Sequence, residues 1–236
     1  MWNNAFNLII LEWLHQYASV SAGFNRLVYF LQGAYVVKGF PVLGLLWYFW
    51  FRDTDPSSRT RRIVLGAFIG CLVSLLIARW INNVAPYQPR PFANEALALS
   101  QFIGLPIAQL EGMRDINTFP SDHGAMFMSL AMGIYLISKK AGTFAFVYVF
   151  AMILLPRLYL GLHYPTDIIA GALLGVACTA IACHARVMRS YEQRMMQSLA
   201  YYPAGFQTFL LLLTFELSVM FIDVRGLIKV VMQYML

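Results

Sequence analysis

Long uncharged apolar runs are the feature that most limits what this chain can fold into. A helix needs about 20 mostly apolar residues to cross the hydrocarbon core of a bilayer. Six such runs occur at about 31–51, 63–84, 122–138, 143–156, 167–185 and 206–222. The composition agrees, because 60% of the 236 residues are hydrophobic and only 12% are charged. The sequence therefore predicts an all-α integral membrane protein with about six transmembrane helices.

Basic residues cluster in three connections between these runs. They are Arg52, Arg59, Arg61 and Arg62; Lys139 and Lys140; and Arg186, Arg189 and Arg194. Short loops rich in Lys and Arg stay on the cytoplasmic side of a membrane. With six alternating spans, the loops at about 85–121 and 157–166 then lie together on the extracytoplasmic side. The net charge of +6 is thus mostly a topology signal, and no continuous basic stripe predicts nucleic-acid binding.

The two ends of the chain differ from the apolar runs. Residues 1–30 mix Glu12 and His15 with apolar neighbours, which is typical of a helix at the headgroup level. They also lack the basic segment that begins a cleavable signal peptide. We expect three regions: an interfacial region at 1–30, a transmembrane core at 31–187, and at 188–236 a cytoplasmic connector followed by the last transmembrane helix.

The two outer loops carry the residue types that a phosphate site needs. Guanidinium groups match phosphate oxygens, a helix N-terminus offers unpaired N–H groups to an anion, and His can act as a nucleophile or an acid near neutral pH. The candidates are Arg90, Ser121, Asp122, His123, Arg157, His163 and Asp167, with Arg114 as a further cation. Both clusters stand at the ends of apolar runs, so we expect a phosphate site at the membrane surface.

Three short motifs in these loops occur in a characteristic order. They are PRP at 89–91, PSDH at 120–123 and RLYLGLHYPTD at 157–167. Together they resemble the signature motifs of the type 2 phosphatidic acid phosphatase superfamily, membrane enzymes that share a catalytic core with vanadium haloperoxidases. The resemblance covers roughly residues 60–187 and implies a helical bundle of that family's type.

Three positions depart from the pattern of this family. The family's first motif usually has Lys or Arg seven residues before the Arg that Arg90 matches, but that position is Asn83. Arg79 lies about one helical turn further back and is the expected substitute. The usual Gly of the second motif is Asp122, which either pairs with an Arg or changes the headgroup that the site accepts. The usual Ser before the third-motif Arg is Pro156, so any hydrogen bond from that Ser is missing.

The resemblance implies a covalent phosphohistidine mechanism. His163 attacks phosphorus, and Asp167 accepts the N–H of the other ring nitrogen, which fixes the tautomer and stabilises the cation. His123 protonates the leaving oxygen and then activates the water that hydrolyses the intermediate. Taken alone, Asp167 also fits an ordinary first-turn residue that satisfies free N–H groups of its helix.

The resemblance also implies how the phosphate is held. Arg90 and Arg157, together with Arg79, neutralise the phosphate oxygens as charge develops. The Ser121 hydroxyl and the backbone N–H groups near Asp122 add hydrogen bonds. Because arginines do the electrostatic work of a cation, we expect no metal and no cofactor.

The position of these groups at a membrane surface favours a lipid phosphate as substrate. The resemblance points to a bacterial phosphatase that hydrolyses undecaprenyl diphosphate on the periplasmic side of the inner membrane. An enzyme that acts on phosphatidylglycerol phosphate, phosphatidate or a lipid A phosphate would have similar sequence features. Two competing hypotheses are a phosphotransferase that passes the phosphate to a lipid A-type acceptor and a non-catalytic membrane protein. No GxxxG pair stands out in the last run, so the oligomeric state stays open.

Overall fold

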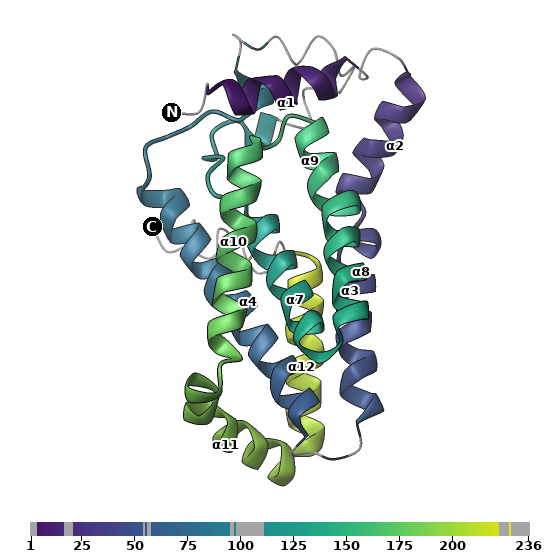
Figure 1. The fold of residues 1–236 in the computed structure, drawn as a ribbon, viewed down its shortest axis with the longest axis vertical. Helices are drawn as coiled ribbons and strands as arrows, with labels where there is room; N and C mark the ends of the chain where they lie inside the picture. The colour runs from purple at the N-terminus through teal and green to yellow at the C-terminus, as the bar shows by residue number, and fades with distance from the viewer. Residues whose placement is uncertain are drawn as a thin grey trace.

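The computed structural model describes residues 4–16, 21–53, 55, 58–94, 97, 111–221 and 227. Within these ranges every regular element is a helix, so the predicted all-helical fold is confirmed (Figure 1). Each of the six predicted runs corresponds to a helix of one bundle. These are α3 (Tyr35–Arg52), α4 (Arg59–Val84), α7 (Asp122–Ile137), the rod of α8 (Lys139–Val149), η4 (Phe150–Leu154) and α9 (Leu155–Tyr159), α10 (Pro165–Ala182), and α12 (Pro203–Ser218).

The bundle helices differ in how well their length fits a membrane. Three of them, α4, the rod at Lys139–Tyr159 and α10, are long and apolar enough to cross, and α2 (Ala22–Gly33) with α3 forms a fourth candidate span bent by 50°. Helices α7 and α12 have only 16 residues each. The short α7 packs against α4, α8 and α10 at the centre of the bundle, and most of its residues are buried. Its length is therefore set by protein neighbours more than by the bilayer.

Small residues let α7 and α10 pack with their backbones in contact. A Cβ added at Gly171 would lie 2.3 Å from the Ser121 carbonyl oxygen, and one at Gly175 would lie 2.1 Å from that of Ala125. No side chain fits in so little space, which is how small residues bring membrane helices together. This contact holds the start of α7, with the second motif, against the start of α10, with the end of the third motif.

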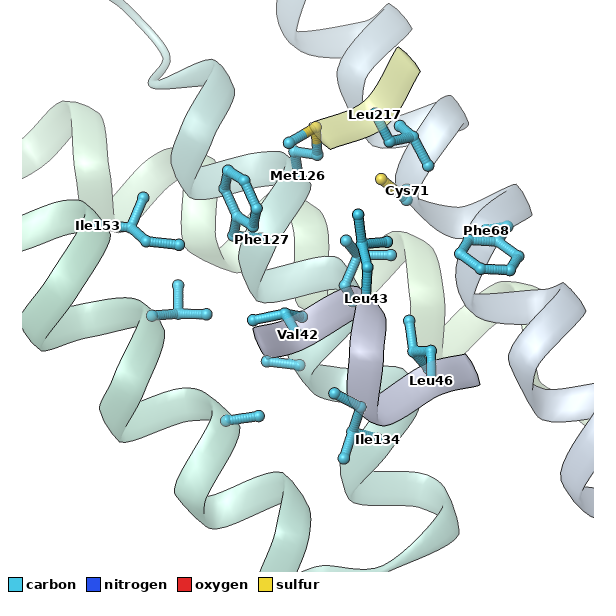
Figure 2. Packing of buried hydrophobic residues seen from close by; sticks show 14 of the residues in the cluster. Val42, Leu43, Leu46, Phe68, Cys71, Met126, Phe127, Ile134, Ile153 and Leu217 are labelled. Carbon is cyan, nitrogen blue, oxygen red and sulfur yellow. The ribbon is translucent and has the colours of Figure 1, made fainter. Parts of the chain in front are cut away.

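An apolar cluster surrounds α7 further along the bundle. Figure 2 shows side chains of α7 packed among those of α3, α4, the α8–α9 rod and α12. The labelled members are Val42, Leu43, Leu46, Phe68, Cys71, Met126, Phe127, Ile134, Ile153 and Leu217. The three free cysteines, Cys71, Cys178 and Cys183, lie within the helical bundle. The apolar cluster fixes the helices whose ends carry the motifs.

The basic segments and the motif loops lie toward opposite ends of the bundle. The end of α3 at Arg52, the start of α4 at Arg59, the α7–α8 connection and α11 (Ala185–Tyr201) lie toward the lower end in Figure 1. There Arg62 of α4 pairs with Glu192 of α11 at 3.4 Å. The motif loops, including η1 (Pro91–Ala93) and η3 (Glu111–Met113), lie toward the upper end. The predicted separation is confirmed, and which end faces the cytoplasm stays a prediction.

The two terminal regions are helical where the structure describes them. Helix α1 (Ala5–His15) lies across the upper end of the bundle and packs against α9 and α10 (Figure 1). Asn7 fixes it there, because its amide donates to the Thr166 hydroxyl at 3.0 Å and accepts the Thr166 N–H at 3.1 Å. The proposed three regions stay a prediction, and most of the chain after residue 221 lies outside the described residues.

Candidate active site

One cavity of about 290 Å³ brings most of the predicted site residues together. Its polar walls come from α2, α3, α4, α7, α9 and two loops. The polar side chains are Gln32, Tyr35, Lys38, Arg79, Arg90, Asp122, His123, Arg157 and His163. Six of the eight predicted site residues are among them, and Ser121 and Asp167 lie outside the cavity wall. Their chemical roles stay predictions at this point.

His163 has a defined tautomer. Its ring is 4% exposed. The Nδ1 atom lies 3.0 Å from the carbonyl oxygen of Thr118. A carbonyl oxygen can only accept, so Nδ1 carries the proton and Nε2 keeps its lone pair. Burial lowers the pKa of His163 below its ordinary value, and the nearby Asp167 opposes this by raising it. The neutral, nucleophilic form of the ring is therefore favoured.

The expected direct hydrogen bond between Asp167 and His163 is wrong. The Asp167 Oδ2 atom lies 3.8 Å from His163 Nδ1, beyond hydrogen-bond distance. The Thr118 hydroxyl lies between them, because it donates to Asp167 Oδ2 at 2.7 Å and is 3.2 Å from His163 Nδ1. The same Oδ2 accepts the Tyr164 N–H at 2.8 Å, so Asp167 also caps the start of α10. This capping bond turns the carboxylate toward its own helix and leaves the gap that Thr118 fills.

Thr118 is a site residue that the motif analysis missed. It is fully buried, and the available signal was a hydroxyl residue two positions before the PSDH motif. The loop that carries it is tied to the end of α4 by two amides. Asn82 donates to the Asn117 carbonyl at 2.7 Å, and Asn117 donates back to the Asn82 carbonyl at 3.1 Å. His163, Thr118 and Asp167 thus form a buried hydrogen-bonded chain.

His123 and Arg157 lie together on the cavity wall. The guanidinium Nη2 of Arg157 is within hydrogen-bond distance of His123 Nε2 and donates to Gln32 Oε1 at 3.3 Å. A guanidinium has no acceptor, so Nε2 of His123 must accept. The first turn of α7 presents His123 to the cavity, while the short α9 presents Arg157.

Arg90 is aimed into the cavity by two backbone carbonyls. Its Nη1 donates to Leu162 at 3.0 Å, and its Nε is 3.4 Å from the Ile116 carbonyl. These bonds join the first motif to the loops of the second and third motifs. Because Arg90 is buried, its pKa is lowered, and the carboxylates of Asp122 and Asp167 oppose the shift.

Arg79 and Asp122 form an ion pair between α4 and α7. Of the two expectations for Asp122, pairing with an Arg is therefore the one found. Both side chains face the cavity, so Arg79 does reach the site from one turn deeper. Ser121 instead caps α7, since its hydroxyl accepts the Gly124 N–H at 3.3 Å and it is fully buried. The walls of this cavity do not include Arg114.

Comparisons with known proteins agree with the order of the motifs. Residues 85–191 match the family model described as PAP2 superfamily. The chain is 35% identical over 154 residues to a protein named bacitracin transport permease protein BcrC from Bacillus licheniformis. The aligned region covers 64% of this chain and 66% of that protein. It is 27% identical over 137 residues to a putative undecaprenyl-diphosphatase, YbjG, from Escherichia coli (strain K12), covering 58% and 61%.

A third relative has a different activity in its name. The lipid A 1-diphosphate synthase of Escherichia coli (strain K12) is 26% identical over 129 residues, covering 53% of this chain and 52% of that protein. The chain thus spans between about half and two thirds of the length of these three relatives. No solved structure matches the chain.

Proposed function

The chain belongs to the PAP2 superfamily, and on that premise we propose that it is a membrane lipid phosphatase acting through a phosphohistidine. The observation that carries the proposal is the arrangement around His163. Its Nδ1 donates to the Thr118 carbonyl, which leaves Nε2 as a nucleophile in a cavity that also holds Arg90 and Arg157. A nucleophile with its other nitrogen fixed by a buried acceptor is the arrangement that covalent phosphoryl transfer needs.

In the first step, His163 Nε2 forms a bond to phosphorus as the bond from phosphorus to the leaving oxygen breaks. Positive charge develops on the imidazole ring, and the chain through Thr118 connects that charge to the Asp167 carboxylate. Arg90 and Arg157 neutralise the transferring phosphoryl oxygens. The ion pair of Arg79 with Asp122 contributes one further cation at the edge of the same cavity.

In the second step, water attacks phosphorus and the bond to His163 breaks, which releases phosphate. His123 takes a proton from that water, because its Nε2 is an acceptor at the cavity wall. For the first step we propose that His123 enters protonated and turned from Arg157, gives its Nε2 proton to the leaving oxygen, and so becomes the neutral ring that accepts the water proton in the second step. This proton transfer matters less for a diphosphate, since the departing lipid monophosphate has a second pKa of only about 6 and leaves readily as an anion.

The proposed substrate is a lipid diphosphate, most specifically undecaprenyl diphosphate. The motif loops lie at one end of a bundle of apolar helices, so a head group can reach the cavity while its tail stays in the bilayer. One relative is named a putative undecaprenyl-diphosphatase and another a bacitracin permease. With the basic loops on the cytoplasmic side, the cavity faces the extracytoplasmic side of a bacterial inner membrane.

A phosphotransferase is the second candidate, favoured by the relative named lipid A 1-diphosphate synthase. Such an enzyme uses the same phosphohistidine but passes the phosphate to a lipid hydroxyl. Incubation with a lipid diphosphate that is radiolabelled in its terminal phosphate, together with a lipid A acceptor, separates the two. Only a phosphotransferase yields a labelled acceptor.

The test of the proposed function is phosphate release from undecaprenyl diphosphate by purified protein in detergent with EDTA. Wild type should release phosphate, and His163→Ala should release none above background. His184→Asn is the matched control, because His184 is exposed at the start of α11 and Asn can keep its helix-capping bond. Equal release by wild type and His163→Ala would contradict the phosphohistidine.

A further inference from the structure

Lys38 is a buried cation that the family motifs do not include. It lies on α3, outside the matched residues 85–191. Lysine in an apolar helix usually extends its ammonium group to the membrane surface. Lys38 is instead only 4% exposed, and it lines the catalytic cavity. Its position therefore needs a reason other than solvation at the headgroups.

The backbone around Lys38 is held in place. A Cβ added at the neighbouring Gly39 would lie 2.8 Å from Cβ of Ser218, so α3 and α12 are in close contact beside Lys38. Its Nζ lies 4.5 Å from the centre of the Tyr35 ring, which also lines the cavity. The contact fixes the backbone beside Lys38, and the side chain lines the cavity with its ammonium group over Tyr35.

No carboxylate is paired with Lys38 among the residues that the structure describes. Besides the Tyr35 ring, the charged or titratable side chains that share the cavity wall with it are Arg79, Arg90, Asp122, His123, Arg157 and His163, and Asp122 is paired with Arg79. Burial of a cation without a counter-charge is strongly unfavourable, so such groups in membrane proteins usually serve a ligand. An anion in the cavity would supply the missing partner.

The charge of the cavity exceeds what one phosphate needs. Its walls hold four cations, Lys38, Arg79, Arg90 and Arg157, and one carboxylate, Asp122, which is paired with Arg79. Three cations thus have no carboxylate partner among the described residues. A phosphate monoester carries about 1.5 to 2 negative charges at pH 7. A second, bridging phosphate adds one more, so a diphosphate matches the three cations better than a monophosphate does.

The cavity also has the size for two phosphates. Its volume is about 290 Å³. A water molecule occupies about 30 Å³ in the liquid, so this space corresponds to about ten waters. A diphosphate head has a comparable number of non-hydrogen atoms, two phosphorus and seven oxygen.

We propose that Lys38 binds the phosphate that stays on the lipid, so that the cavity prefers a diphosphate head group to a monophosphate. Arg90 donates to the carbonyl of Leu162, the residue before His163, and it holds the phosphate that reacts. Lys38 lies over Tyr35 on α3, three residues after Gln32, which accepts from Arg157 beside His123, and we place the leaving oxygen on this side of the cavity. The inference rests on the proposed phosphatase function and deepens it.

The test compares kcat/KM for farnesyl diphosphate and farnesyl monophosphate in wild type, Lys38→Met and Lys38→Arg. Loss of one charge-assisted hydrogen bond to the substrate corresponds to about a 10- to 100-fold decrease in kcat/KM. We expect Lys38→Met to lower the diphosphate-to-monophosphate ratio of kcat/KM at least tenfold, and Lys38→Arg to keep it within about threefold. Lys140→Met is the matched control, because it removes the same charge from an exposed position on α8. An unchanged ratio in Lys38→Met would overturn the proposal, whether both rates fall equally or neither falls.

A second measurement does not depend on turnover. Thermal shifts of wild type are recorded with inorganic pyrophosphate and with inorganic phosphate, and we expect the pyrophosphate shift to be larger in wild type and equal to the phosphate shift in Lys38→Met. Equal shifts in wild type would overturn the proposal even if Lys38→Met failed to fold. If wild type hydrolysed neither substrate but showed the larger pyrophosphate shift, the phosphatase function would fail and the two-phosphate cavity would stand.

Discussion

Substitution of Thr118 by Val tests the hydrogen-bonded chain behind His163. Val has nearly the same shape as Thr but no hydroxyl, so the change removes the 2.7 Å bond to Asp167 Oδ2. The 3.0 Å bond from His163 Nδ1 to the backbone carbonyl of residue 118 remains. The ring should therefore keep its tautomer and lose its connection to the carboxylate.

The size of the effect follows from the burial of Asp167. Its side chain is fully buried, its Oδ1 has no hydrogen-bond partner among the described residues, and Oδ2 would keep only the Tyr164 N–H among them. A hydrogen bond to a charged group contributes about 1.5–3 kcal/mol. If that energy stabilises the imidazolium formed in the transition state, kcat should fall about 10- to 100-fold. KM should change less than about threefold, because Thr118 does not line the cavity.

The assay is steady-state phosphate release from a lipid diphosphate by monodisperse protein in detergent. Thr118→Ser serves as the matched control, since it keeps the hydroxyl and should keep kcat within about threefold. Asp167→Asn measures how far kcat falls when the carboxylate itself is lost. If Thr118→Val matched wild type in kcat while Asp167→Asn was inactive, Asp167 would act without the hydroxyl and the reasoning would be refuted.

Three further outcomes are expected. Burial lowers the pKa of His163, so the neutral nucleophile should persist to lower pH. The acid limb of the pH profile of kcat/KM should then have a pKa below the ordinary His value of about 6.5. An acid limb above that value, after the substrate's own ionisation is subtracted, would contradict this. Asp122→Gly frees Arg79 from its ion pair and should lower KM for the phosphate head up to about tenfold, whereas a raised KM would mean that Asp122 itself helps to bind the substrate. Gly175→Ala places a methyl group 2.1 Å from the Ala125 carbonyl oxygen and should destabilise the fold by about 1–3 kcal/mol, seen as a lower Tm in detergent. Gly44→Ala on α3 is the control, because no described atom lies within contact distance of a Cβ added there.

The sequence alone predicted the helices and most of the cavity. Apolar runs separated by basic loops indicate membrane helices because a bilayer accepts only backbones whose hydrogen bonds are satisfied internally. The second motif stands at the start of the third run and the third motif at the start of the fifth. With alternating spans, both starts then had to lie on one side of the bundle. His123, Arg157 and His163 were placed in one cavity by this reasoning, and they line one cavity in the structure.

Other features depended on tertiary contacts that leave no local pattern. Thr118 and Lys38 lie outside the three motifs, and each reaches the site through packing with distant segments. The direct bond from Asp167 to His163 failed because the carboxylate was already turned toward the Tyr164 N–H. A motif specifies which residues are near one another along the chain. The competition of one oxygen among several donors, and the burial of a lysine in a cavity wall, are decided only when the helices pack.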